Sequence, residues 1–184
     1  MKEYVDILDA HGEKTGTTCT RDQAHRYGYL HATVHIWFYT RNHEILFQKR
    51  STKKETFPGL WDISVAGHVS AGETIIEAAI KEIHEEIGVS VKATDLYNIG
   101  IEEKLVKHSN EFIDAEFNHV FICELTVPFS QLSRQKEEVD ELKLTSIKEF
   151  ESILNNNSYL TSFVPRQKSY YQNILNLLYE TLDR

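Results

Sequence analysis

Apolar residues recur with a helical period in the stretch between Thr74 and Gly88. Four isoleucines follow one another at spacings of three or four residues: Ile76, Ile80, Ile83 and Ile87. Thr74, with Glu77 three residues later, is typical of a capping box at a helix start. Gly88 suits the position that ends a helix. The pattern therefore predicts one amphipathic helix that buries its isoleucine face against a sheet.

Upstream of this helix, alternation and β-branched or aromatic residues predict strands at 4–8, 32–39 and 44–49. Turn-like segments are expected at 11–16 and 41–44. Thr20 and Gln23 form a second capping-box pattern, which predicts a short helix that ends near Gly28. Residues 61–65 are expected to be an extended segment that leads into the central helix.

Downstream, the pattern predicts strands at 95–100, 101–107, 117–127 and 141–144. The polar residues 130–137 are expected to form a mobile loop. Ser146 and Glu149 predict another helix start, and Pro165 precedes a final amphipathic helix. The mixture of strands and helices, without repeats or linkers, predicts a single α/β domain over residues 1–184.

Glu82, Glu85 and Glu86 lie at positions i, i+3 and i+4 of the predicted helix. This spacing puts three carboxylates on one face, where like charges repel unless a cation lies among them. Mg²⁺ and Mn²⁺ prefer oxygen ligands of this kind. A solvated acidic helix face is the simpler interpretation of this cluster. The crowding of three carboxylates on one face instead favours a divalent metal site.

The same stretch resembles the Nudix box, G-x5-E-x7-R-E-U-x-E-E-x-G-U, where U is an aliphatic residue. The positions that match are Gly67, Glu73, Glu82, Ile83, Glu85, Glu86, Gly88 and Val89. One position departs, because Lys81 stands where the family has arginine. Lysine keeps the charge but lacks the planar fork of arginine, which puts the catalytic rate in question more than the fold.

The resemblance implies a Nudix fold, in which a mixed β-sheet is sandwiched between α-helices. It also implies that Glu85 and Glu86 hold Mg²⁺ or Mn²⁺ with the carbonyl of Gly67, while Glu82 is a base or a further ligand. Glu116 is the candidate for an additional ligand after the box. Lys81 would orient the first glutamate, with Glu73 as its structural partner. Arg50 and Lys54, in a cationic segment before the box, are candidates for binding substrate phosphate.

Much of the chain also resembles the Nudix branch that contains isopentenyl-diphosphate isomerase. The shared segments are residues 24–31, 49–68 and 113–121. In the isomerase, histidines and acidic residues of these segments hold a second metal ion. The matching positions here are His25, His31, His68, Asp114 and Glu116. A solvent-facing or hydrogen-bonded histidine is the alternative for each of them, and together they predict a second site for a transition metal or Mn²⁺.

The isomerase carries a catalytic cysteine where this chain has Ala66, which cannot transfer protons. The complete glutamate triplet instead favours metal-dependent hydrolysis of a phosphoanhydride bond in a nucleoside diphosphate derivative. Two alternatives stay open: an isomerase-like enzyme, and a Nudix domain that senses nucleotides without chemistry.

Composition narrows the class of partner. The net charge of −8 over 184 residues, without a basic block, makes a nucleic-acid polymer an unsuitable partner. A small phosphoanhydride substrate remains compatible, because a metal and a few local cations outweigh the mean charge. The polar N-terminus and the absence of a long apolar run lead us to expect a cytoplasmic chain without a membrane partner. Cys19 and Cys123 do not show the spacing of a metal site or a redox motif. Because many Nudix relatives are homodimers, the resemblance implies that this chain forms a homodimer.

Overall fold

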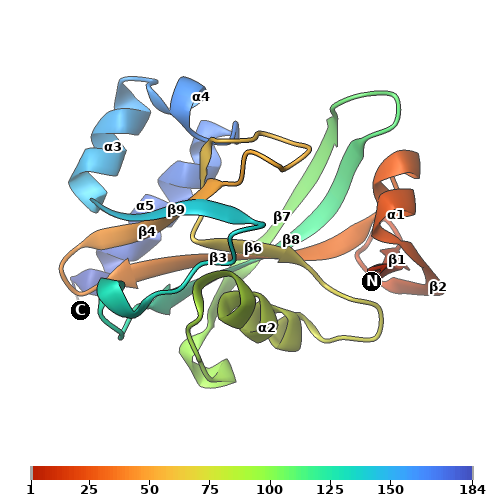
Figure 1. Cartoon of the computed structure of the whole chain (residues 1–184), viewed down its shortest axis with the longest axis horizontal. Coiled ribbons are helices and arrows are strands. Elements are labelled where there is room, and N and C mark those ends of the chain that lie inside the picture. Colours follow the sequence, from red (N-terminus) through yellow and green to blue (C-terminus); the bar gives the residue numbers. More distant parts are fainter. Residues whose placement is uncertain (1, 184) are drawn as a thin grey trace. The chain divides into compact units, whose positions relative to one another are not determined.

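The computed structural model describes residues 2–183, and Figure 1 labels their helices and strands. The strands are β1 (Tyr4–Leu8), β2 (Lys14–Thr20), β3 (His31–Thr40), β4 (Glu44–Arg50), β5 (Trp61–Asp62), β6 (Val65–His68), β7 (Tyr97–Lys107), β8 (Ile113–Glu124) and β9 (Val139–Ser146). The helices are α1 (Arg21–Tyr27), α2 (Ile75–Ile87), α3 (Ile147–Asn155), α4 (Tyr159–Ser162) and α5 (Lys168–Leu182), with single 3-10 turns at Ala93–Asp95 and Phe129–Gln131. Strands and helices are interspersed along the chain, as the sequence predicted for an α/β protein.

The chain divides into two compact units. The first holds the residues up to Ile36 together with 66–84 and 90–122, and the second holds 37–65, 85–89 and the residues from Cys123 onward. Strands β3 and β8 and helix α2 each contribute residues to both units. The expectation of a single domain over 1–184 stays a prediction.

In the first unit, β1 and β2 form an antiparallel hairpin beside α1 (Figure 1). Val5, Cys19 and Ala24, one from each element, form a small apolar core between them. Thr20 caps α1 through the predicted box with Gln23, and Gly28 ends the helix in the left-handed conformation. The long strands β7 and β8 pair antiparallel from Tyr97↔Ile122 to Lys107↔Ile113.

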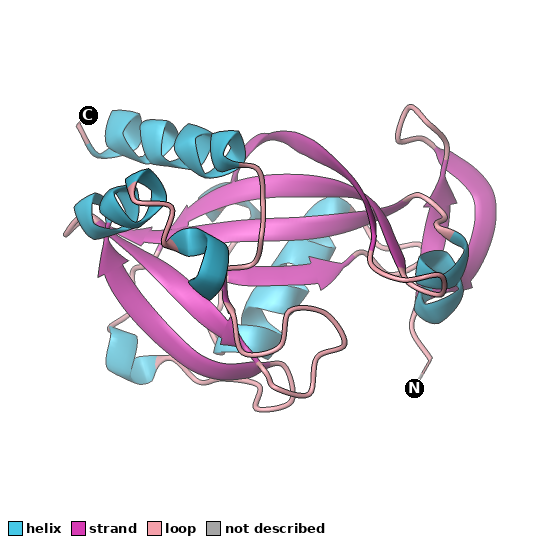
Figure 2. Cartoon of the chain, turned by 90° about the horizontal axis from the view of Figure 1, so that it is seen from above, coloured by secondary structure: helices cyan, strands magenta, loops and turns pink. Residues whose placement is uncertain are grey.

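In the second unit, β4 is the central strand. It pairs antiparallel with β9 along its length, and also with the end of β3 and with β5. Helices α3, α4 and α5 follow β9 in sequence, and α3 contacts α5 (Figure 2). The core of this unit is aromatic, with ring centroids of contacting pairs 4.7–6.4 Å apart in a cluster of Trp37, Phe47, Phe150, Phe163 and Tyr171.

Helix α2 begins and ends where its local sequence predicts. The Thr74 hydroxyl accepts a 3.2 Å hydrogen bond from the Glu77 backbone N–H, and the Glu77 carboxylate accepts a 2.9 Å bond from the Thr74 N–H. Ile83 and Ile87 are fully buried, whereas Ile76 and Ile80 are only half-buried. The apolar face therefore packs most tightly in the second half of the helix, next to the glutamates.

Three sequence expectations were wrong in detail. Residues 14–16 belong to strand β2, because pairing with β1 extends this polar segment beyond what its own composition predicts. The two strands expected at 95–107 are one strand, in which a bulge lies between Asn98 and Gly100. Strand β8 starts at Ile113, earlier than expected.

Cys19 and Cys123 are both buried and form no disulfide. Within residues 2–183, no helix is long and apolar enough to cross a membrane.

Candidate metal and phosphate sites

Gly67 and Glu82 approach each other so closely that a side chain at position 67 would displace the Glu82 carboxylate. A Cβ built on Gly67 would lie 2.1 Å from the Glu82 Cδ and 2.4 Å from its Oε2. Gly67 has no positive φ angle, so the requirement is for space and not for backbone conformation. The absence of a side chain at Gly67 allows the Glu82 carboxylate to lie against the backbone of β6. Carboxylate oxygens such as those of Glu82 suit a hard divalent cation.

Lys81 is held by three neighbours in the first unit. Its Nζ donates to Glu73 Oε2 at 2.9 Å and to Ser70 Oγ at 3.2 Å, and it lies 3.5 Å from Glu82 Oε1. Glu73 also accepts a bond from the Ser70 backbone N–H. The lysine therefore links Glu73 to the first glutamate of the triplet as a point charge.

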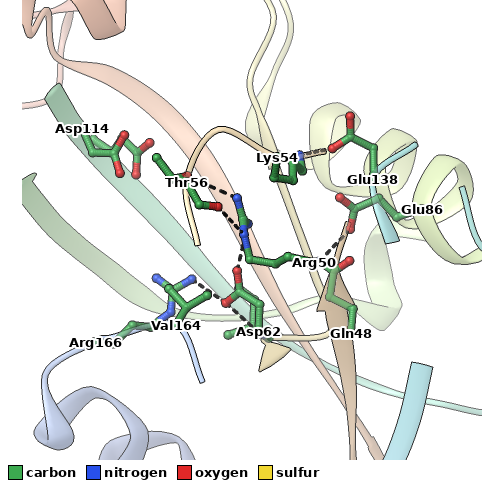
Figure 3. Close-up of polar contacts among 12 residues, drawn as sticks. Gln48, Arg50, Lys54, Thr56, Asp62, Glu86, Asp114, Glu138, Val164 and Arg166 are labelled. Atoms are coloured by element: carbon green, nitrogen blue, oxygen red, sulfur yellow. Dashed lines mark hydrogen bonds and ion pairs between the residues drawn. The ribbon is translucent and has the colours of Figure 1, made fainter. Parts of the chain in front are cut away.

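In the second unit, Glu86 is buried at 3% exposure. Its Oε2 accepts a 3.1 Å hydrogen bond from the side-chain amide of Gln48 on β4 (Figure 3). Glu85, one residue before it on α2, is exposed. The two glutamates thus differ, because one is fixed by a buried partner and the other faces solvent.

Arg50, predicted to bind phosphate, already makes several hydrogen bonds. Its Nη1 donates to Asp62 at 3.1 Å, and its Nε and Nη2 donate to the carbonyl and hydroxyl of Thr56 (Figure 3). Lys54 forms an ion pair with Glu138. Both cations are therefore tied to protein groups, and Arg50 holds the segment between β4 and β5 against Asp62.

Histidines from α1, β3 and β6 meet in the first unit. The metal-ligating atoms of His25, His31, His68 and Glu116 all lie within 4.8 Å of one another. Glu116 therefore lies with the histidines. Asp114 lies behind them, where its Oδ1 is 3.2 Å from His25 Nδ1.

The hydrogen bonds of the histidine rings fit a metal site. His31 Nδ1 donates to the Tyr29 carbonyl at 2.8 Å, which leaves Nε2 as the acceptor, and this buried atom has no partner among the described residues. Burial lowers the pKa of His31, which favours the neutral ring that a metal requires. Asp114 in turn orients His25, as carboxylates do behind ligating histidines. Three imidazoles and a carboxylate suit a transition metal or Mn²⁺.

Asp114, beside this cluster, is surrounded by groups that donate hydrogen bonds or carry positive charge. Burial opposes its ionisation, but hydrogen bonds from His25, Lys104 and His108 and the charge of Lys104 hold its pKa well below the usual range. The Lys104 Nζ lies 2.6 Å from Asp114 and 3.4 Å from Glu116. Sequence inspection missed Lys104 because only the pairing of β7 with β8 brings it opposite Glu116.

A family model for the NUDIX domain matches residues 29–167. The chain belongs to the NUDIX family. Among curated relatives, it is 36% identical to Nudix hydrolase 3 of Arabidopsis thaliana over 158 residues, which are 84% of this chain and 20% of that protein. It is 35% identical to an uncharacterised Nudix hydrolase of Clostridium acetobutylicum, over 84% of this chain and 75% of that one. This NUDIX chain thus spans about a fifth of the plant protein's length.

More distant relatives support the branch expected from the sequence. The chain is 28% identical to isopentenyl-diphosphate Delta-isomerase 2 of Photorhabdus laumondii, over 85% of this chain and 84% of the isomerase. A solved structure from Deinococcus radiodurans superposes with a TM-score of 0.67 at 18% identity, covering 97% of this chain and 98% of that one. A MutT NUDIX hydrolase from Burkholderia pseudomallei superposes with a TM-score of 0.54 at 16% identity, over 65% of this chain and 85% of that one. The predicted Nudix fold, with its mixed sheet and helices, is therefore confirmed.

Proposed function

We propose that the protein hydrolyses a phosphoanhydride bond in a nucleoside diphosphate derivative, in the presence of Mg²⁺ or Mn²⁺. The observation that carries this proposal is the close approach of Glu82 to Gly67, because it brings the first carboxylate of the acidic triplet to the backbone at the start of the box. Glu85 and Glu86 follow on the same helix at the next turn. Family membership supports hydrolase chemistry in general.

In this mechanism Glu85, Glu86 and the Gly67 carbonyl would hold the ion, with Glu82 as base or further ligand. When bound, Mg²⁺ or Mn²⁺ would neutralise phosphate charge and lower the pKa of a water molecule. Glu82 accepts the proton of the attacking water, whose oxygen forms the new bond to phosphorus while the bond from phosphorus to the bridging oxygen breaks. Lys81 orients Glu82, and Lys54 and Arg50 stand as candidates for the outer phosphate oxygens.

The histidine cluster is a proposed second metal site. His25, His31, His68 and Glu116 supply its donors, and Asp114 fixes the ring of His25. This cluster and the isomerase relatives favour isopentenyl-diphosphate isomerisation as the second candidate function. Ala66 argues against it, since a methyl group neither donates nor accepts the proton that moves in an isomerisation.

The test is hydrolysis of a panel of nucleoside diphosphate derivatives with Mg²⁺ or Mn²⁺. We expect nucleotide release by the wild type, and a rate lower by roughly 10²–10⁴ in Glu82→Gln if Glu82 is the general base. Incubation with isopentenyl diphosphate should give no dimethylallyl product. Formation of the dimethylallyl product at an enzymatic rate would contradict the proposed hydrolysis and support isomerisation as the activity. Ligand binding without turnover of any panel member would indicate a sensor.

The remaining expectations about the protein's surroundings stay predictions. They are a small-molecule phosphoanhydride substrate, no nucleic-acid polymer, no membrane partner, a homodimeric assembly and a cytoplasmic location. Size-exclusion chromatography with light scattering measures the assembly directly.

A further inference from the structure

Gln48 is a buried polar residue that directly follows the apolar stretch of strand β4. On β4 it follows the fully buried Ile45, Leu46 and Phe47, and it is itself only 3% exposed. Its Nε2 lies 3.1 Å from the Glu86 Oε2, and Figure 3 shows the two side chains pointing toward each other. A buried amide at such a position requires a hydrogen-bond partner, and the carboxylate of Glu86 provides one.

The backbone around Glu86 is fixed independently of its side chain. The Glu86 carbonyl accepts a 3.1 Å bond from the Gln135 N–H, and the Ile87 carbonyl accepts one from the Ser133 N–H at the same distance. Gly88 then ends the helix at φ +71°. Residues 133–135 therefore hold the end of α2 by main-chain bonds. What these bonds leave undetermined is the direction of the Glu86 carboxylate.

The chemistry of an amide suits this task better than that of a cation. An arginine or lysine at position 48 would also hold the carboxylate, but its positive charge would oppose a metal ion nearby. The neutral Gln48 side-chain N–H fixes the direction of the Glu86 Oε2 by a hydrogen bond and adds no positive charge.

We propose that Gln48 is a positioning residue, which orients the Glu86 carboxylate so that it can bind the divalent metal. This inference rests on the proposed function, because it takes Glu86 as a ligand. Gln48 acts through Glu86 and is given no contact with substrate. Replacing a partner that orients a metal ligand typically weakens metal affinity by roughly 10–100-fold.

The test compares Mn²⁺ binding to the wild type and to Gln48→Met, which keeps the length of the side chain and removes the donor. Free Mn²⁺ is measured by electron paramagnetic resonance, with the chain otherwise unaltered. We expect affinity for the Glu86 site to fall by roughly 10–100-fold. Turnover at low Mn²⁺ should fall accordingly and should recover at saturating Mn²⁺, since the variant keeps Glu86 itself.

Tyr170→Phe is the matched control. Its hydroxyl accepts a 3.0 Å hydrogen bond from the Trp37 indole N–H, so this variant also loses one buried hydrogen bond in the same unit. We expect it to lower the melting temperature while Mn²⁺ affinity stays that of the wild type. If both variants lose affinity equally, the effect of Gln48 is one of general stability, and the inference is overturned.

Gln48→Asn provides a second test in case Gln48→Met does not fold. It keeps a polar amide but shortens the side chain by one methylene, so the amide no longer reaches Glu86, and the same loss of affinity is expected. Wild-type affinity in either folded variant overturns the inference. A different result would contradict the proposed function: the wild type would not bind Mn²⁺ or Mg²⁺ at the box, or it would bind the metal without hydrolysing any substrate.

Discussion

Arg166 Nη2 lies 2.8 Å from Asp62 Oδ1, and this contact joins positions 104 residues apart. The Arg166 side chain is 7% exposed and that of Asp62 is 2% exposed. The other oxygen of Asp62 accepts a bond from Arg50, so one buried carboxylate serves two guanidinium groups (Figure 3). The start of α5 is thereby connected through Asp62 and Arg50 to the segment that carries Lys54.

Asp62→Asn should lower the free energy of unfolding by about 3–5 kcal/mol, because it leaves two guanidinium groups without their buried counter-charge. Urea denaturation at pH 7 measures the loss. Arg41→Met is the control, since Arg41 pairs with Glu124 in an exposed setting and its loss should lower the free energy of unfolding far less. Losses of equal size in the two variants would contradict a special role for the buried carboxylate.

The same carboxylate predicts a pH dependence of stability. Burial raises the pKa of Asp62, but the charges and hydrogen bonds of Arg166 and Arg50 more than offset this and hold the pKa well below that of an unfolded aspartate. A group with a depressed pKa in the folded state stabilises the protein above its unfolded pKa of about 3.9 and loses that effect as the pH falls further. The stability difference between wild type and Asp62→Asn should therefore be constant from pH 7 to 5 and shrink below about pH 4. A difference that stays constant down to pH 3 would show that Asp62 is not the titrating group.

Gly67→Ala should weaken metal binding far more than it weakens the fold. The added methyl group would collide with the Glu82 carboxylate at 2.1 Å, and Glu82 must move away. Gly16→Ala offers the contrast, because Gly16 has φ +81° and open space around it, so alanine strains the backbone without touching a glutamate. Isothermal titration with Mg²⁺ and thermal melting separate the two effects. Unchanged affinity in Gly67→Ala would remove Gly67 and Glu82 from the proposed site.

Lys81→Ala should lower hydrolytic activity, and Lys81→Arg should keep or raise it. The ammonium group bridges Glu73 and Glu82 at 2.9 and 3.5 Å, and arginine could bind the same oxygens with two N–H groups. Steady-state kinetics with a panel substrate gives the comparison. Equal rates in the wild type and the alanine variant would show that this chain has lost the orienting role.

If both proposed metal sites bind an ion, the chain binds two metal ions. Glu85→Gln combined with Glu86→Gln should remove the rise in melting temperature caused by Mg²⁺, as ligand linkage requires for a bound ion. His31→Ala should leave that rise intact and reduce the Mn²⁺ or Zn²⁺ content, because it deletes a buried Nε2 from the cluster. Metal analysis by mass spectrometry counts the ions. Identical stoichiometry in wild type and His31→Ala would exclude His31 as a ligand.

The sequence determined those features that depend on neighbouring residues. Helix α2 and its caps follow from Thr74, Glu77 and a helical period, all within a few turns. The same helix puts Glu82, Glu85 and Glu86 close together along its last turns. The hairpin between β3 and β4 likewise follows from two strands joined by a short turn. Local sequence misjudged β7, because it predicts two strands, 95–100 and 101–107, where the structure has one, and Gly100 lies at their junction. Pairing with β8 instead accommodates it as a bulge, since hydrogen bonds to a neighbouring strand outweigh the weak local preference.

Only the tertiary structure decided which distant side chains meet. Glu116 joins His25, His31 and His68, while Asp114, two residues away, faces His25 from behind. Arg50, a candidate phosphate ligand by sequence, is bonded to Asp62 and Thr56. Gln48 and Glu86 meet across 38 positions without any motif that links them. Buried polar groups need hydrogen-bond partners, and the packing of the whole chain decides which groups lie close enough. The spacing of residues along the sequence therefore does not predict these pairs.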